Sequence, residues 1–264
     1  MNRGLYRRSL MPGSASAAFT PAADANLHTW FEFTNDTVEF DKDGSDGISD
    51  IYDKKNSHDF EQTTSARRPL QVDDVLNGKG VMRFDASNTE WIGTAEAAST
   101  WDFLHTSAST VYVLIKINIA NPATDYFILG NNTSAAQSGY FLQYDDNGES
   151  NAVRVILTNG TGTQLINAVS ANEAMPTEQY LLITTVYDAS DMEIFINNSS
   201  VATDSNNGSP AGSAAEALDI GRVDESFIGL DADVALVAIS EAAHDANTRA
   251  DYVDYINTQF GLSL

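Results

Sequence analysis

The sequence predicts an all-β protein, an antiparallel jelly-roll β-sandwich that ends in one α-helix. Three observations support this prediction. Short apolar segments with a period of two recur along the chain, clusters of Asn, Asp, Gly and Ser separate them, and a helical apolar stripe occurs near the C-terminus. Many short strands with turn signals between them are typical of a sandwich. The 264 residues fit one such domain, because no repeat or change of composition divides the body of the chain.

The N-terminal segment 1–26 differs from the rest of the chain in charge and composition. Arg3, Arg7 and Arg8 make it basic, and residues 11–25 are rich in Ala, Ser, Gly and Pro. No apolar stretch of roughly 7–15 residues follows the arginines, so a signal peptide is not expected. We therefore expect a basic arm and flexible linker over 1–26 and a jelly-roll domain over 27–264. The three arginines are the candidates for anchoring the chain on a partner protein.

Two hairpins are predicted in the central part of the chain. Residues 153–157 and 164–169 are apolar runs that flank an Asn-Gly-Thr-Gly turn signal. Residues 180–187 and 192–196 form a second pair, joined by the short polar connection 188–191. Each pair is expected to form two adjacent antiparallel strands.

Two further strands and the helix complete the prediction. Residues 111–119 alternate with a period of two, and every second residue from 228 to 238 is apolar, which predicts one continuous apolar face. Asp245 and Gly261 are a typical N-cap and a typical residue after the last helical turn, so we expect a helix over 245–260. The residues of its apolar stripe are Ala246, Ala250, Val253, Ile256 and Phe260.

Charge and composition exclude several classes of function. The formal net charge is −23, and residues 84–264 hold four basic and 24 acidic residues. Such a surface repels phosphate, so neither nucleic acid nor an anionic membrane is an expected partner. No apolar run approaches the ~20 residues of a membrane-spanning helix. The chain has no cysteine, which excludes disulfides and thiolate metal sites.

Short motifs follow one another in a recognisable order between residues 27 and 262. They are Trp30, Gly47-Ile48-Ser49-Asp50, Arg83-Phe84-Asp85, Trp91-Ile92, Leu218-Asp219-Ile220-Gly221, Gly229-Leu230-Asp231 and the closing helix. In this order they resemble the concanavalin A-like lectin/glucanase superfamily, in the laminin-G-like form found in bacterial surface proteins and phage structural proteins. The resemblance implies the jelly-roll sandwich. Ala86 and Ala232 stand where the family has turn glycines, which weakens any transfer of its sugar or metal sites.

Glycoside hydrolysis is not expected. A retaining glycosidase needs two carboxylates about 5–5.5 Å apart, and the laminarinase branch of the superfamily that this chain resembles places them in a Glu-x-Asp-x-x-Glu strand. The sequence has no such string. Asp231 and Asp233 share one strand face, but the next residues of that face are Ala235 and Val237. No catalytic residue is therefore assigned.

An acidic segment is the strongest local signal in the sequence. Its carboxylates are those of Asp41, Asp43, Asp46, Asp50 and Asp53. Oxygen ligands that alternate around a glycine are typical of a calcium loop. If Asp46 and Gly47 occupy the fifth and sixth positions of such a loop, however, Lys42 and Gly44 fall at the first and third positions, which must supply ligands. Two interpretations are therefore open, a Ca²⁺ site or an acidic hairpin without metal, and no other cofactor is expected.

Glycan contacts are expected from a tryptophan and from the loops at the sandwich rim. Trp30 and Trp91 lie within strand patterns and are predicted to be core residues, whereas Trp101 precedes a loop-like segment and is predicted to be exposed. Loops 131–139 and 145–151 are rich in amide and carboxylate groups, which suit polyols. The candidate contacts are Trp101, Asn131, Asn132, Gln137, Asp145, Asp146 and Asn147.

These features favour a non-enzymatic virion structural protein of a tailed bacteriophage, either a head decoration or fibre subunit or a tail adhesin. The arm would contact other capsid or tail proteins, and the sandwich would face outward and contact host surface glycans. The alternative is a free or cell-surface carbohydrate-binding module of lectin type, outside any virion. A hydrolase is the third hypothesis. A homo-oligomer is compatible with either binding role, because strand edges and flat sandwich faces commonly pair.

Overall fold

The computed structural model describes residues 18–34, 39–119, 125–132, 137–146, 149–161, 163–209, 212–224 and 227–264. The arginines of the predicted arm, Arg3, Arg7 and Arg8, lie outside the described residues. Phe19 and Asp24 contact the C-terminal helix: the centroids of the Phe19 and Tyr252 rings are 5.0 Å apart, and the Tyr252 hydroxyl donates to Asp24 Oδ2 at 3.1 Å. Packing of the chain against the domain therefore begins before residue 27, the predicted domain start.

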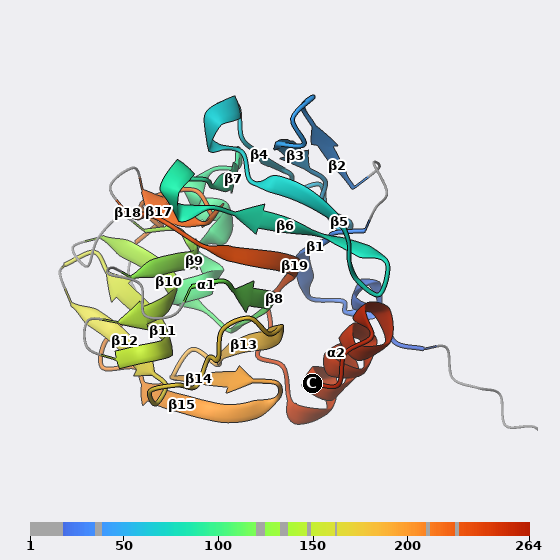
Figure 1. The fold of residues 1–264 in the computed structure, drawn as a ribbon. Coiled ribbons are helices and arrows are strands. Elements are labelled where there is room, and N and C mark those ends of the chain that lie inside the picture. Colours follow the sequence, from blue (N-terminus) through green and yellow to red (C-terminus); the bar gives the residue numbers. More distant parts are fainter. Residues whose placement is uncertain are drawn as a thin grey trace, which may run out of the picture.

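Two antiparallel sheets face each other and form the predicted sandwich (Figure 1). The eight-stranded sheet has the order β15-β14-β13-β8-β19-β6-β5, and β1 also pairs with β19. Its strands are β1 (Leu27–Glu32), β5 (Leu70–Leu76), β6 (Lys79–Phe84), β8 (Ser109–Ile117), β13 (Leu181–Tyr187), β14 (Asp191–Ile196), β15 (Ser199–Ser205) and β19 (Ala232–Ser240). All of its pairings are antiparallel.

The nine-stranded sheet has the order β12-β11-β10-β9-β16-β7-β4-β3-β2. Its strands are β2 (Phe40–Lys42), β3 (Ile48–Ile51), β4 (Phe60–Glu61), β7 (Ile92–Thr94), β9 (Tyr126–Gly130), β10 (Ser138–Asp146), β11 (Glu149–Asn159), β12 (Gln164–Val169) and β16 (Asp219–Ile220). A separate hairpin consists of β17 (Arg222–Asp224) and β18 (Phe227–Ile228). Both hairpins predicted from the sequence, β11–β12 and β13–β14, are confirmed.

The main core fills the space between the two sheets. Large aromatic residues contribute much of it, and the fully buried ones include Phe31, Phe60, Trp101, Tyr140 and Tyr187. Burial of a large apolar side chain stabilises the fold by roughly 1.5–3 kcal/mol. A core of this size makes the sandwich a rigid support for groups on its outer surfaces.

Strand β19 departs from the predicted single apolar face. The pairing register shifts between Val234 and Leu236, which marks a β-bulge. As a result Val234 and Val237 face the main core, whereas Leu236 belongs to the second apolar cluster. The prediction of one face running from 228 to 238 is therefore wrong, because one additional residue reverses the alternation.

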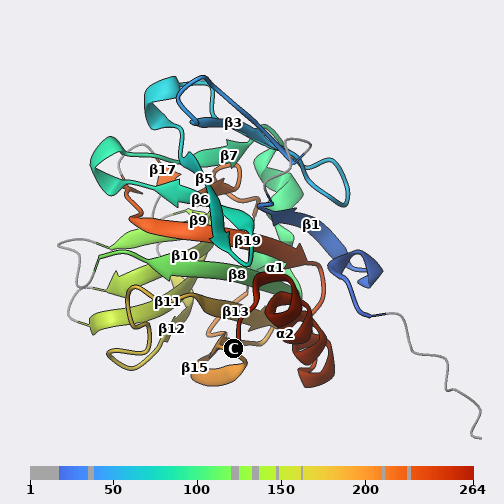
Figure 2. The same cartoon turned by 45° about the vertical axis from the view of Figure 1, so that its right-hand side comes forward.

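The C-terminal helix is confirmed with its two caps. Helix α2 (Ala246–Phe260) begins where the Asp245 carboxylate accepts a hydrogen bond from the Thr248 amide at 2.8 Å. It ends at Gly261, whose φ of 67° is in the left-handed region that glycine adopts without strain. Tyr252 and Ile256 pack on the outer side of the eight-stranded sheet, and Figure 2 shows α2 in front of that sheet.

The outer side of the nine-stranded sheet is covered differently. There the β17–β18 hairpin lies over β9, and Val223 joins a small apolar cluster with Phe127, Phe141 and Ile156. In the described part of the chain, no helix has the length and hydropathy that a membrane crossing requires. The region beside the hairpin, over β16, β7 and β4, holds the site described next.

Candidate functional site: a polar pocket on the outer sheet

Three adjacent strands in the middle of the nine-stranded sheet each contribute one outward residue to a single row. Gly93 of β7 pairs with Asp219 of β16 on one side and with Glu61 of β4 on the other. Side chains alternate along a strand, so the residues next to these three point inward. Those inward neighbours, all buried in the core, are Phe60, Ile92 and Ile220. The row therefore lies on the face away from the core.

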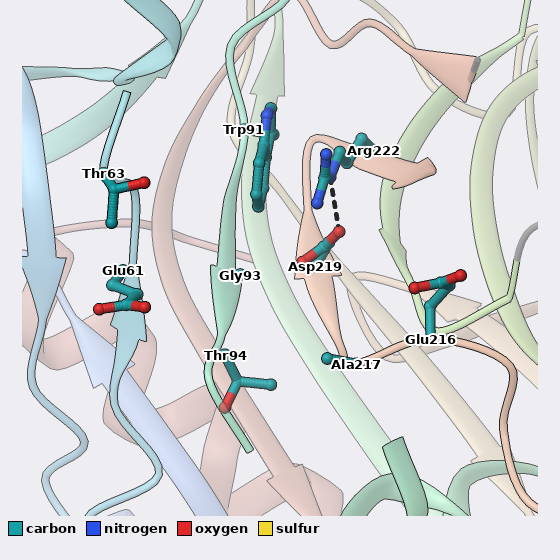
Figure 3. A pocket seen from close by; sticks show the side chains of 9 residues that line it. All are labelled: Glu61, Thr63, Trp91, Gly93, Thr94, Glu216, Ala217, Asp219 and Arg222. Atoms are coloured by element: carbon teal, nitrogen blue, oxygen red, sulfur yellow. Dashed lines mark hydrogen bonds and ion pairs between the residues drawn. The ribbon is translucent and has the colours of Figure 1, made fainter. Parts of the chain in front are cut away.

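The missing side chain of Gly93 creates a pocket of about 150 Å³. A Cβ at this position would lie 1.7 Å from Asp219 Oδ1 and 3.1 Å from Trp91 Cζ3, so only glycine leaves both groups in place. The pocket is lined by Glu61, Thr63, Trp91, Gly93, Thr94, Glu216, Ala217, Asp219 and Arg222 (Figure 3). We call it the outer-sheet pocket.

Arg222 links the indole and the carboxylate of the pocket. Its guanidinium carbon lies 3.0 Å from the centroid of the Trp91 ring, in a cation–π contact. Its Nε donates to Asp219 Oδ2 at 2.6 Å. The Trp91 backbone is fixed as well, because its amide donates to the Arg67 carbonyl and its carbonyl accepts from Gln62 Nε2. The pocket is thus formed before any ligand binds.

The Asp219 carboxylate has an unusual environment. Its side chain is only 7% exposed, although the residue lines an open pocket. Burial raises the pKa of Asp219 to about 7, and the nearby Glu216 adds to this effect, while Arg222 acts in the opposite direction. A buried group with a strongly raised pKa in a pocket is typical of a functional site.

The raised pKa of Asp219 predicts a pH-dependent stability difference between the wild type and Asp219→Asn. The folded state favours the protonated carboxyl. The stability that the protonated Asp219 side chain contributes is therefore complete below the unfolded pKa of about 4 and is lost as pH rises through about 7. Asparagine does not ionise. We expect the unfolding free energy of Asp219→Asn relative to wild type to increase between pH 4 and pH 8, at about 1.4 kcal/mol per unit of pKa shift. Urea unfolding across this range measures it.

Asp188 provides a control of opposite sign. Hydrogen bonds from the backbone of Asp191 and from Ser190 lower the pKa of Asp188. Its stabilising contribution is present above the unfolded pKa and is lost as pH falls, so Asp188→Asn should lose stability relative to wild type as pH rises from 3 to 6. A pH-independent difference for Asp219→Asn would contradict the buried-carboxylate description.

Of the three tryptophans, one lies where the sequence analysis placed it and two do not. Trp30 is buried, as predicted. Trp101 is fully buried in the main core, so the prediction that it is exposed is wrong. Trp91 was assigned to the core, but it is half-buried and lines the outer-sheet pocket.

The predicted rim contacts are also placed differently. Asn131 and Asn132 are fully buried. Asn131 Oδ1 accepts from the Tyr140 amide at 2.8 Å, and Asn132 Nδ2 donates to the Gln137 carbonyl at 3.1 Å, so both amides stabilise the loop and are not free for a ligand. Of the other candidates, Gln137 is exposed, Asp145 and Asp146 end strand β10, and Asn147 lies outside the described residues.

The acidic segment 41–53 uses two of its carboxylates to hold backbone amides. Asp43 accepts from the amides of Ser45 and Gly47 and pairs with Arg68 at 3.0 Å. Asp53 accepts from the backbone amides of Trp30, Lys55, Asn56 and His58. These contacts support the hairpin interpretation of the segment.

The remaining carboxylates of this segment are not gathered at one point. Asp41 accepts from the Tyr52 hydroxyl, Asp46 pairs with Lys42 at 2.7 Å, and Asp50 lies in β3 opposite Glu61. Among the residues that the structure describes, no three His, Asp or Glu side chains are grouped as metal ligands. The set proposed for Ca²⁺ is therefore not brought together.

The sequence analysis missed the acidic and glycine residues of the pocket. One local signal was present, because Asp219 interrupts the apolar run Leu218–Ile220 and stands three residues before Arg222. An unpaired acid in a buried strand is costly, so such an acid indicates a nearby cation. Glu61 and Gly93 carry no comparable signal, since only the strand order brings them beside Asp219.

The two packed antiparallel sheets and the C-terminal helix form a lectin-like β-sandwich. A family model described as the concanavalin A-like lectin/glucanases superfamily matches residues 86–247. The match covers more than half of the chain, and the chain belongs to this superfamily. No curated protein sequence matches it.

Solved structures with the same fold include the binding domains of botulinum neurotoxin D and of a mosquitocidal protein. The binding domain of Paraclostridial Mosquitocidal Protein 1 has a TM-score of 0.63 at 14% identity, with 88% of this chain and 53% of that chain covered. The receptor binding domain of botulinum neurotoxin D has a TM-score of 0.57 at 11% identity, with 87% and 52% covered. A botulinum neurotoxin serotype D ligand binding domain in complex with N-acetylneuraminic acid has a TM-score of 0.53 at 14% identity, with 81% and 51% covered. The present chain spans about half the length of these structures, and the similarity shows the fold.

Proposed function

We propose that this chain is a non-enzymatic glycan-binding module and that the outer-sheet pocket is its binding site. The supporting observation is the Asp219 carboxylate, which is buried at an open pocket beside the Trp91 ring. Carboxylates accept hydrogen bonds from sugar hydroxyls, and an indole packs against the apolar C–H groups of a sugar ring. The pocket is smaller than the ~300–1,000 Å³ that drug-sized ligands occupy, so it suits a single sugar residue.

A glycan array followed by calorimetric titration tests this proposal. We expect saturable binding by the wild type. The double variant Glu61→Gln/Thr63→Val changes two residues that line the pocket, and it should weaken binding by about tenfold or more. Glu193→Gln, in β14 of the opposite sheet, is the matched control and should bind as the wild type does.

Three outcomes would contradict the proposal. An array without any bound glycan would remove the binding function. Equal affinity of the wild type and the Glu61→Gln/Thr63→Val variant would place the site elsewhere. Release of reducing sugar from a bound glycan would contradict the non-enzymatic role and favour the hydrolase hypothesis.

We further propose that this module is carried by a tailed-phage virion, as a head decoration or fibre subunit or as a tail adhesin. The support is the contrast between the basic segment around Arg3, Arg7 and Arg8 and the acidic remainder of the chain. Mass spectrometry of purified particles tests this location. Many copies per particle would support it, and recovery only from cell-surface or secreted fractions would favour the free lectin-like module. Full incorporation of a chain without residues 1–23 would contradict anchoring by the arginines.

A further inference from the structure

The charges around the outer-sheet pocket are unbalanced. Three carboxylates line it, those of Glu61, Glu216 and Asp219, against the one guanidinium of Arg222. Figure 3 shows Glu61 and Glu216 on opposite sides of Gly93, with Asp219 between Gly93 and Glu216. Any ligand that enters between these side chains meets a negative potential.

The one cation is already committed to other groups. Arg222 Nε donates to Asp219 Oδ2 at 2.6 Å, and its guanidinium lies against Trp91. Arg222 is therefore engaged by Asp219 and Trp91, while Glu61 and Glu216 form no ion pair within the described part of the chain. Two exposed carboxylates with free acceptor oxygens remain at the entrance of the pocket.

This arrangement discriminates between classes of sugar. A uronic or sialic acid would bring a further negative charge against Glu61 and Glu216, and the net charge of −23 adds to the repulsion. A neutral hydroxyl forms only ordinary hydrogen bonds. An ammonium group has three donors and forms charge-assisted hydrogen bonds with carboxylates, which are roughly twice as strong.

We infer that the outer-sheet pocket binds an amino sugar, a hexosamine residue with a free protonated amino group. The amino group lies beside one of the two exposed carboxylates, Glu61 or Glu216, and the sugar ring lies beside Trp91. This inference rests on the proposed glycan-binding function and names the ligand class of the same site. The inferred ligand is a cationic sugar, in contrast to the anionic uronic and sialic acids.

Calorimetric titration with three pentasaccharides tests the inference. The probes are a glucosamine pentamer with free amino groups, the fully N-acetylated pentamer and a galacturonic acid pentamer, near pH 6 and at about 0.15 M salt to screen distant charges. We expect the glucosamine pentamer to bind at least tenfold more tightly than the N-acetylated pentamer, and the galacturonate pentamer not to bind.

Paired variants separate the pocket from the general acidity of the chain. Glu61→Gln/Glu216→Gln and Asp191→Asn/Glu193→Gln each remove two negative charges, the first pair at the pocket and the second in β14 of the other sheet. We expect the first pair to weaken glucosamine-pentamer binding at least tenfold and the second to leave it within twofold.

The possible outcomes distinguish this inference from the proposed function. Equal binding of the N-acetylated and glucosamine pentamers would overturn the amino-sugar inference and leave the glycan-binding function standing. Equal losses in both variant pairs would show binding by the overall charge and would also overturn the inference. Absence of any glycan ligand from the wider array would remove the proposed function itself.

Discussion

Replacing Gly93 by alanine is expected to abolish ligand binding in the outer-sheet pocket, with a loss of affinity of about a hundredfold or more. The new Cβ would lie 1.7 Å from Asp219 Oδ1. Because Arg222 holds the Asp219 carboxylate, both side chains must move, and the base of the pocket is filled. Overpacking of this kind typically costs about 1–3 kcal/mol of stability. Calorimetric titration and urea unfolding measure the two effects.

Two further variants make this result interpretable. Gly44→Ala is the matched control, since no atom lies within 4 Å of a Cβ at that position, and it should change neither binding nor stability. The double variant Gly93→Ala/Asp219→Ala removes the steric conflict. It should recover stability but not binding, because the carboxylate is lost. Wild-type affinity in Gly93→Ala would show that this pocket is not the binding site.

Local patterns predicted much of the fold. Periodicity of two identified β8 and the β11–β12 and β13–β14 hairpins, and the cap residues Asp245 and Gly261 bounded helix α2. These features depend on residues close together in the sequence. The bulge in β19 did not follow from the pattern, because both faces of that strand are buried and its apolar residues show no change at the bulge.

The pocket depends on long-range strand order and was not predictable in this way. Glu61, Gly93 and Asp219 are distant in sequence and become neighbours only because β16 inserts between β9 and β7. No local periodicity encodes that insertion. The family resemblance indicated the sandwich but gave no order for the short strands β4, β7 and β16.

The assignments of Trp91 and Trp101 were reversed because the local backbone geometry differs from the predicted one at each residue. Trp91 immediately precedes Ile92, which points into the core, so alternation turns Trp91 outward. Trp101 is the last residue of a 3₁₀ turn, Ala98–Trp101, and the segment after it, which resembles a loop in composition, begins with the short helix α1, Phe103–Thr106. These turns direct the Trp101 ring into the core.

Trp101→Ala is expected to destabilise the fold by about 3–5 kcal/mol. The ring is fully buried and contacts an aromatic cluster, with centroid distances of 4.9 Å to His28 and 6.0 Å to Phe60. Its removal leaves a cavity that these neighbours fill only in part. For a domain of this size the loss corresponds to a decrease of roughly 10 °C in the melting temperature, measured by calorimetry.

The comparison that decides the role of Trp101 uses stability and binding together. Leu70→Ala is the control, because Leu70 is 40% exposed and its removal should change stability by at most about 0.5 kcal/mol. Trp101 does not line the outer-sheet pocket, so Trp101→Ala should retain wild-type affinity for the glycan when measured well below its melting temperature. An unchanged melting temperature with lost binding would instead indicate a direct sugar contact at Trp101. The expected result, a large loss of stability with binding intact, assigns the Trp101 ring to the core and excludes it as a ligand contact.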